Sequence, residues 1–291
     1  MFIAIVGTRC SGKDSVQKYL IDKGFTPLSL SGSDDSARQR LRFSTPADML
    51  AHITRHWTEH FVTMDLGTRA LLAPFMRRPF FMLISAAADS LHAIRDLVHL
   101  HIDNAFDAVS DLHFHLEKLD LLDPSHLRPE WDAYFMTIAS LASHRSNCMK
   151  RRVGAVLVDA RGGNRILATG YNGTPRGLTN CNAGGCPRCN TGIESVECIC
   201  LHAEENALLE AGRERVGHGA VLYCNTCPCL KCTVKIIQTG VSTVVYNLSY
   251  KVDDASASLF KESGVELRRY NPNHKHYLPT IDAPGLRMTN P

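Results

Sequence analysis

Residues 198–212 read CICLHAEENALLEAG, and residues 220–232 read AVLYCNTCPCLKC. Both segments place metal-binding side chains at the start of a predicted helix, and a predicted strand lies between the two helices. His202 opens the first helix. Cys229 and Cys232 stand three apart at the start of the second helix, so both side chains point to the same side of it. The two segments therefore predict an α/β domain that brings one histidine and two cysteines together.

The side chains of His202, Cys229 and Cys232 are suited to a catalytic metal. Zinc prefers imidazole and thiolate ligands, and a catalytic zinc keeps three protein ligands and leaves one position open. Glu204 lies two residues beyond the histidine, where its carboxylate can move a proton from an activated water to a substrate. The pattern H-x-E followed by P-C-x-x-C is typical of zinc deaminases. A purely structural zinc knuckle is the alternative, and it would leave Glu204 without a role.

Composition and charge argue against several other classes of protein. The chain has 291 residues, of which 44% are hydrophobic and 21% are charged, as in a soluble globular protein. A net charge of +3 is too small to favour a nucleic-acid or membrane surface. No apolar run is long enough to span a bilayer, and residues 2–7 fit a buried strand better than a signal peptide. We therefore expect a cytoplasmic protein, with the nucleus as the alternative.

The distribution of cysteines indicates two domains. Ten of the eleven cysteines follow residue 147, and without a signal peptide this density of thiols favours metal binding over disulfides. Prolines interrupt the helical pattern ahead of residue 130. We place the first domain at 1–122, the second at 129–275 and an irregular tail at 276–291.

Hydrophobic periodicity predicts an α/β fold for both domains. The first domain alternates strands and helices, which is typical of a parallel sheet. Its strands are expected at 2–7, 60–65 and 79–85, with a helix at 13–23 and helical segments between and after the other strands, including the His-rich stretch 90–119. The second domain is expected to be a three-layer α/β/α sandwich. Its helices are expected at 131–145, 202–211, 229–239 and 254–263, and its strands at 153–159, 165–172, 219–224, 242–247 and 264–269.

The second domain resembles the cytidine/deoxycytidylate deaminase superfamily, and within it the fungal dCMP deaminases. The resemblance covers 129–270 and rests on the two segments quoted above together with RSNCMKRRVGAVLV (145–158), ATGYNGTPRG (168–177), NCNAGGCPRCN (180–190) and IIQTGVSTVVY (236–246). GYNGTPRG ahead of HAE is more selective for the dCMP branch than the zinc pattern alone. The resemblance implies a cytidine-deaminase-like α/β/α sandwich.

The same resemblance implies an activity and its site residues. The activity is the hydrolysis of dCMP to dUMP and ammonia, which supplies dUMP for thymidylate synthesis, with Zn²⁺ as cofactor. Glu204 would protonate N3 of cytosine and help the amine leave, Asn172 would bind the sugar, and the backbone of Ala203 would contact the pyrimidine. The family is commonly a homo-oligomer, activated by dCTP and inhibited by dTTP. The loop that contains Gly173 and Arg176 is associated with the effector region.

A nucleoside monophosphate also needs cationic or amide donors near its phosphate. Arg151 and Arg176 flank the strands of the expected site, as do Arg145, Lys150 and Arg152. Each of these side chains is a candidate phosphate ligand. A solvated basic face is the alternative for each of them.

Six further cysteines lie between residues 148 and 200. Cys186 and Cys189 have the spacing of a zinc knuckle, and a structural zinc takes four ligands. The resemblance places Cys148 and Cys181 at positions that carry a second zinc in some members of the family. We therefore expect a second, structural Zn²⁺ at Cys148, Cys181, Cys186 and Cys189, with Cys198 as the first replacement. Reduced thiols without a metal are the alternative.

Residues 7–14, GTRCSGKD, have the G-x-x-x-x-G-K spacing of a phosphate-binding loop between a strand and a helix. Gly7, Gly12 and Lys13 are the candidate phosphate ligands. Asp14 stands where this motif has the Ser or Thr that holds Mg²⁺. The region resembles nucleoside-monophosphate-kinase-like P-loop domains, so a bound nucleotide effector with Mg²⁺ is one expectation. Three interpretations stay open: nucleotide binding without turnover, an active kinase, and a degenerate scaffold that aids assembly.

Three alternatives to dCMP deamination are kept. The chain can be a deaminase of another cytosine nucleoside or nucleotide, a non-catalytic nucleotide-binding regulatory protein, or a nucleotide kinase with an accessory zinc domain. The intact Glu204 argues against the second alternative, because a site without catalysis needs no proton carrier.

Overall fold

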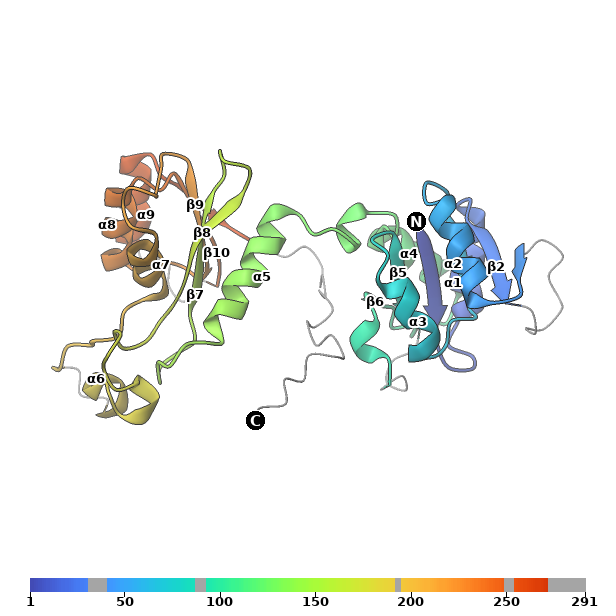
Figure 1. Cartoon of the computed structure of the whole chain (residues 1–291), viewed down its shortest axis with the longest axis horizontal. Coiled ribbons are helices and arrows are strands. Elements are labelled where there is room, and N and C mark those ends of the chain that lie inside the picture. Colours follow the sequence, from blue (N-terminus) through green and yellow to red (C-terminus); the bar gives the residue numbers. More distant parts are fainter. Residues whose placement is uncertain (31–40, 87–92, 192–194, 249–253, 272–291) are drawn as a thin grey trace. The chain divides into compact units, whose positions relative to one another are not determined.

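The computed structural model of the chain describes residues 1–30, 41–86, 93–191, 195–248 and 254–271. These residues form two compact units, which follow one another in sequence at the bond between Pro129 and Glu130. Figure 1 shows a sheet with packed helices in each unit. The predicted tail, 276–291, lies outside the described residues. No helix in the described part of the chain has the length and apolar character needed to cross a membrane.

The first unit is built on a parallel sheet whose described strands have the order β3-β2-β4-β1-β5-β6. The strands are β1 (Phe2–Val6), β2 (Thr26–Leu30), β3 (Leu41–Phe43), β4 (Phe61–Thr63), β5 (Phe81–Ser85) and β6 (Leu100–His101). The helices are α1 (Lys13–Asp22), α2 (Pro46–Arg55), α3 (Arg69–Met76) and α4 (Val109–Leu119).

Side chains of β1 alternate between the two faces of this sheet, as the period of a strand requires. Phe2 and Ala4 share a core with α2 and α3, whereas Ile3 and Ile5 share a core with α1 and α4. Helices therefore cover both faces, which is how parallel sheets are stabilised in proteins.

The structure corrects the sequence prediction in the first unit. The helical prediction across 90–119 is wrong in its first part, because Leu100–His101 forms β6 beside β5 and only Val109–Leu119 is α4. A two-residue edge strand is too short to carry a periodic pattern. β2 and β3 are also missing from the prediction, since Pro27 interrupts the first and the second has only three residues.

The second unit contains a mixed sheet with the strand order β11-β10-β9-β7-β8. β7 pairs antiparallel with β8 and β9, and the remaining pairs are parallel. The strands are β7 (Gly154–Asp159), β8 (Arg165–Tyr171), β9 (Ala220–Thr226), β10 (Thr243–Leu248) and β11 (Glu266–Arg269). The helices are α5 (Trp131–Ser143), α6 (Pro187–Thr191), α7 (Ala203–Ala211), α8 (Leu230–Thr239) and α9 (Asp254–Ser263).

Helices lie on both faces of this second sheet (Figure 1). Along β7, Ala155 and Leu157 point into the core shared with α7, α8 and α9, and Val156 and Val158 point into the core shared with α5. α7 and α8 are neighbours on the same face. This layer carries the residues that sequence analysis selected for a metal site.

Candidate active site and cysteine cluster

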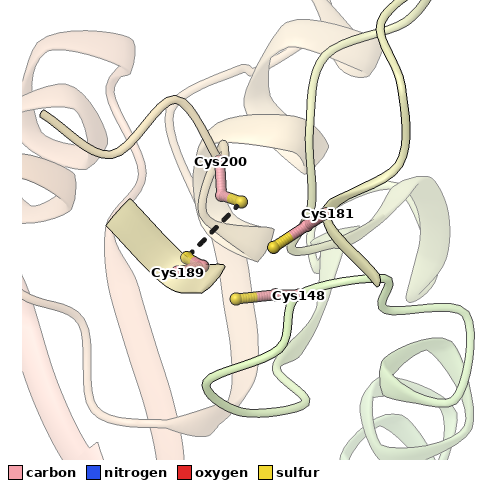
Figure 2. Close-up of side chains that lie close together, drawn as sticks. All are labelled: Cys148, Cys181, Cys189 and Cys200. Atoms are coloured by element: carbon pink, nitrogen blue, oxygen red, sulfur yellow. Dashed lines mark hydrogen bonds between the residues drawn. The ribbon is translucent and has the colours of Figure 1, made fainter. Parts of the chain in front are cut away.

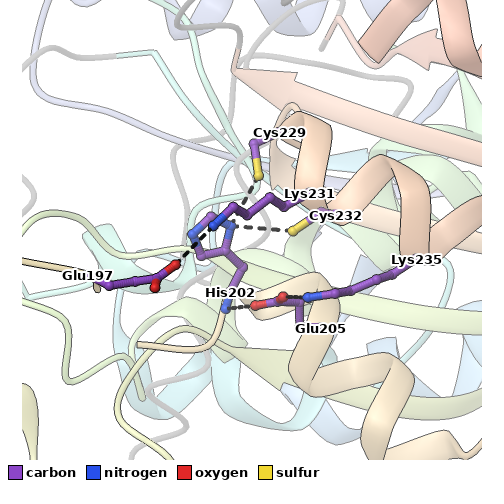
Figure 3. A network of polar contacts seen from close by, with 7 residues as sticks. All are labelled: Glu197, His202, Glu205, Cys229, Lys231, Cys232 and Lys235. Carbon is purple, nitrogen blue, oxygen red and sulfur yellow. Dashed lines mark hydrogen bonds and ion pairs between the residues drawn. The ribbon is translucent and has the colours of Figure 1, made fainter. Parts of the chain in front are cut away.

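His202, Cys229 and Cys232 converge on one point (Figure 3). The Nδ1 atom of His202 lies 3.4 Å from the sulfur of Cys229 and 3.3 Å from the sulfur of Cys232. Tetrahedral bonds of about 2.0 Å to nitrogen and about 2.3 Å to sulfur would separate such atoms by about 3.5 Å. The donor set therefore fits a zinc ion with one open coordination position.

Two helix N-termini position these ligands. His202 is the residue before α7 and Cys229 is the residue before α8, so the positive ends of two helices meet at the ligand atoms. Glu205 accepts a 2.8 Å hydrogen bond from the backbone N–H of His202 and forms an ion pair with Lys235 of α8 (Figure 3). This capping arrangement joins the two ligand-bearing helices. Sequence reasoning missed Glu205, although an acidic residue at the third position of a helix was a usable signal.

Glu204 is buried beside the ligands, with 4% of its surface exposed. Burial raises the pKa of its carboxyl group. Hydrogen bonds from Cys232 and His202 outweigh burial and lower the pKa of the Cys229 thiol to about 3, so this sulfur is ready to bind a cation. A buried carboxyl next to metal ligands is suited to proton transfer.

A cavity of about 410 Å³ opens onto these groups. This volume lies in the range of small-molecule sites, about 300–1,000 Å³. His202 and Glu204 line it together with Asn172. Three cationic side chains, which can bind an anionic substrate group, also contribute to the lining: Lys150, Arg151 and Arg188.

The amide of Asn172 joins the segments around the cavity. Its oxygen accepts hydrogen bonds from the backbone N–H of Val153 (2.8 Å) and the hydroxyl of Ser146 (2.6 Å). Its nitrogen donates to the carbonyl oxygen of Arg151 (2.9 Å). These bonds use one of the two N–H groups of the amide, and the other N–H can serve a ligand.

Two glycines set the distance between β8 and the metal ligands. Gly173 pairs with Leu201 through N–H···O bonds of 3.1 and 2.8 Å, directly before His202. A Cβ atom at Gly170 would lie 2.1 Å from the carbonyl oxygen of Ala203, so α7 packs against the bare backbone of β8. The close approach at Gly170 requires glycine, and a Cβ atom at Gly173 would lie 2.4 Å from the side-chain oxygen of Asn147.

The remaining candidates for substrate contact occupy other environments. Ala203 is fully buried and Arg176 is exposed, and neither belongs to the residues that line the cavity. Arg188 does line it, but sequence reasoning missed it. Arg188 stands between Cys186 and Cys189 in the insert at 173–198, and only the folding of this insert brings it to the cavity.

The six cysteines between residues 148 and 200, called the six-cysteine cluster below, gather in one place. Their sulfurs form two groups of four in which all atoms lie within 4.8 Å of one another. The first group is Cys148, Cys181, Cys189 and Cys200 (Figure 2), and the second is Cys186, Cys189, Cys198 and Cys200. Cys200 therefore stands in the first group where sequence analysis had placed Cys186. The pairing of Leu201 with Gly173 brings Cys200 into this group. Sequence spacing alone does not predict that Cys200 belongs to it.

The loop around Gly7 and Gly12 connects β1 to α1, which begins at Lys13. Gly12 has a φ angle of +83°, a left-handed conformation that favours glycine. The side chain of Asn104 donates a 3.1 Å hydrogen bond to the carbonyl oxygen of Ser11 and holds the loop. Binding of a phosphate or Mg²⁺ by this loop stays a prediction.

Comparison with known proteins places these observations in a family. The model of the cytidine and deoxycytidylate deaminase zinc-binding region matches residues 129–248. A crystal structure of dCMP deaminase from cyanophage S-TIM5, in complex with dCMP and dUMP, is 34% identical and covers 50% of this chain and 100% of that chain, with a TM-score of 0.40. The deoxycytidylate deaminase of Schizosaccharomyces pombe is 44% identical over 93% of this chain and 97% of that protein. That of Saccharomyces cerevisiae is 38% identical over the same shares. Because the chain is this similar to two fungal deoxycytidylate deaminases over nearly their whole length, it belongs to the deoxycytidylate deaminase family.

Proposed function

We propose that this chain hydrolyses dCMP to dUMP and ammonia in the cavity beside His202. One observation carries the proposal: a three-ligand zinc site and the buried Glu204 share a cavity with three cationic side chains. Fungal relatives that are similar over nearly the whole chain are deoxycytidylate deaminases.

Each residue of the site has a role in this reaction. His202, Cys229 and Cys232 would hold the zinc, which supplies Lewis-acid activation of the attacking water. Glu204 accepts a proton from that water as its oxygen bonds to C4 of cytosine, and passes the proton to N3. Glu204 then carries the second proton to the amino group while the C4–N bond breaks, which releases ammonia and leaves the carbonyl of uracil.

The cavity lining supports a monophosphate substrate. Lys150, Arg151 and Arg188 line the cavity together with Glu204, so the cavity offers positive charge for a phosphate and an acid for the base. The spare N–H of Asn172 is suited to a sugar hydroxyl. Ala203 would contribute only its backbone, since its side chain is buried.

Ammonia release from dCMP, CMP, deoxycytidine and dCTP, measured in parallel on the full chain, tests the proposed substrate. We expect dCMP to have the highest kcat/KM, because only this compound offers both a deoxyribose and a single phosphate. Higher turnover of any other compound in this set would overturn the choice of substrate.

A variant separates catalysis from metal binding. Glu204→Gln is expected to lose at least about 100-fold in kcat, since an amide cannot carry the proton. Its zinc content, measured by elemental analysis, should equal that of the native chain. Glu210→Gln, an exposed acid on the same helix, is the matched control. Full ammonia release by Glu204→Gln would contradict the assigned role.

The proposal extends to the rest of the chain. We propose regulation by dCTP and dTTP, a homo-oligomeric state, and two domains at 1–122 and 129–275. The loop that begins at Gly173 supports the regulatory part, because its backbone pairs with the residue before His202. The strand–loop–helix from β1 to α1 in a parallel sheet supports nucleotide binding by the first unit.

A further inference from the structure

The two groups of four within the six-cysteine cluster have two members in common, Cys189 and Cys200. We propose that this cluster binds two zinc ions as a binuclear thiolate site. Cys189 and Cys200 bridge the two metals. Cys148 and Cys181 complete the coordination of the first metal, and Cys186 and Cys198 complete the coordination of the second.

The distances between sulfurs agree with this assignment. In a tetrahedral site with Zn–S bonds of about 2.3 Å, the sulfurs are about 3.8 Å apart. Cys186 and Cys189 lie 3.7 and 3.6 Å, respectively, from Cys198. The two bridging sulfurs, on Cys189 and Cys200, lie 4.0 Å apart (Figure 2). This last pair is the edge that the two tetrahedra share.

The surroundings of the sulfurs are those of bound thiolates. Cys181 and Cys186 are fully buried and Cys200 is 8% exposed, and unpaired thiolates are costly in such places. The backbone N–H of Met149 donates to the sulfur of Cys181 at 3.5 Å, and the side-chain N–H of Asn190 does so at 3.8 Å. Such N–H···S contacts orient metal ligands and spread their charge.

Cationic side chains lie close to the cluster as well as to the proposed phosphate site. Two Zn²⁺ ions and six thiolates carry +4 and −6, a net charge of −2. Lys150, Arg151 and Arg188 line the cavity to which Cys148, Cys189, Cys198 and Cys200 also contribute. These cations offset the negative charge of the cluster.

The same geometry couples the cluster to the active site. Cys200 lies two residues before His202, and Leu201 between them pairs with Gly173. A metal on Cys200 therefore fixes the backbone that carries a ligand of the catalytic zinc. The described residues of the insert at 173–198 form no named strand, so metal–thiolate bonds supply the rigidity that a sheet would otherwise give.

Three simpler states are the competing outcomes. A single zinc in either group would leave two of the six thiols without a metal. Disulfides would remove thiols in pairs, and every cysteine of the described residues is free of disulfides. Fully reduced thiols would leave the cluster without any metal.

Zinc per chain is measured by elemental analysis on the full chain, purified anaerobically with a non-thiol reductant. We expect three zinc ions, one at His202 and two in the cluster. The double variant His202→Ala, Cys232→Ala should retain two zinc ions per chain, which distinguishes zinc in the cluster from zinc in the active site. Two zinc ions in the native chain and one in this double variant would overturn the proposal.

Single cysteine variants distinguish a binuclear site from a cluster that binds only one zinc ion. Cys148→Ser and Cys198→Ser should each lose one zinc, because each thiol belongs to one group only. Cys189→Ser should lose both cluster ions. A single zinc in the first group predicts no loss with Cys198→Ser, and a single zinc in the second group predicts no loss with Cys148→Ser. Cys10→Ser, at an exposed thiol of the first unit, is the matched control and should change nothing.

A measurement on the native chain makes the test independent of how well the variants fold. X-ray absorption at the zinc edge should show a metal–metal distance below about 4.6 Å, which is twice the Zn–S bond length. After exchange with ¹¹³Cd, two cadmium resonances should be coupled through the shared sulfurs. Absence of both signals at full metal loading would refute bridging.

Discussion

Replacing Lys150 is the most direct test of phosphate recognition. Its side chain lines the cavity, and a charge-assisted bond to phosphate is worth more than a neutral one. We expect Lys150→Gln to raise KM for dCMP about tenfold, which corresponds to about 1.4 kcal/mol, with kcat nearly unchanged. Steady-state kinetics with dCMP and with deoxycytidine checks this, because the nucleoside should show no such effect.

Arg213→Gln is the control for that variant. Arg213 is exposed after the end of α7 and does not belong to the cavity lining, so its loss should leave both KM values unchanged. Equal losses with dCMP and deoxycytidine in Lys150→Gln would show that Lys150 supports the fold and not the phosphate.

Local spacing decided which residues of the site could be predicted from sequence. His202, Glu204, Cys229 and Cys232 follow fixed intervals at helix starts, so the chemistry can be seen without a structure, and the structure brings them together. Cys200 and Arg188 reach their positions only through the fold of the insert. Their contacts come from tertiary structure, and sequence spacing carries no signal for them.

At the scale of elements, the contact between β8 and α7 controls the position of the ligands. Gly170→Ala would place a methyl group 2.1 Å from the carbonyl oxygen of Ala203 and 2.5 Å from the backbone nitrogen of Ala207. We expect α7 to shift, with a loss of roughly 1–3 kcal/mol in the free energy of unfolding and a parallel loss of zinc affinity. Urea unfolding and zinc titration with a competing chelator would measure both.

Gly67→Ala is the matched control for that change. Gly67 has open space around a new Cβ atom and no left-handed backbone, so the substitution should leave stability and zinc affinity unchanged. Normal zinc affinity in Gly170→Ala would mean that α7 tolerates displacement from β8.

The predicted elements of the second unit lie within about two residues of the observed ones. Each of them is long enough to show a period of two or of 3.6 residues. The short elements were missed for the opposite reason: β3 and β6 have three and two residues, and α6 lies among cysteines and prolines without an apolar face. β3 and β6 form because their backbones pair with β2 and β5. The sequences of these two short segments carry no pattern that predicts this pairing.

At the scale of the whole molecule, the two units differ in the side chains that they bring together. The first unit holds two apolar cores on the faces of its parallel sheet. The second unit adds to its cores the candidate metal ligands at His202 and in the six-cysteine cluster. Uneven cysteine content indicated this division from the sequence, because ten thiols fall on one side of it.

Acid should destabilise the first unit through His99. The Nδ1 atom of His99 accepts a 3.0 Å hydrogen bond from the backbone N–H of Leu83 in β5, and burial lowers the pKa of the ring to about 4. The unfolded chain takes up this proton near pH 6.5, whereas the folded chain resists it. The free energy of unfolding is therefore retained above about pH 6.5 and falls as the pH drops towards about 4, by about 2 kcal/mol at pH 5.

Urea titrations at about pH 7 and about pH 5, followed by pulsed hydrogen exchange of a peptide that covers β5, measure this loss. His99→Gln keeps an acceptor for Leu83 but cannot titrate, so its urea midpoint should change less between the two pH values than that of the native chain. His56→Gln, at an exposed histidine of the same unit, should keep the native difference. If His99→Gln and the native chain lose stability equally, the buried ring is not the group that makes this unit sensitive to acid.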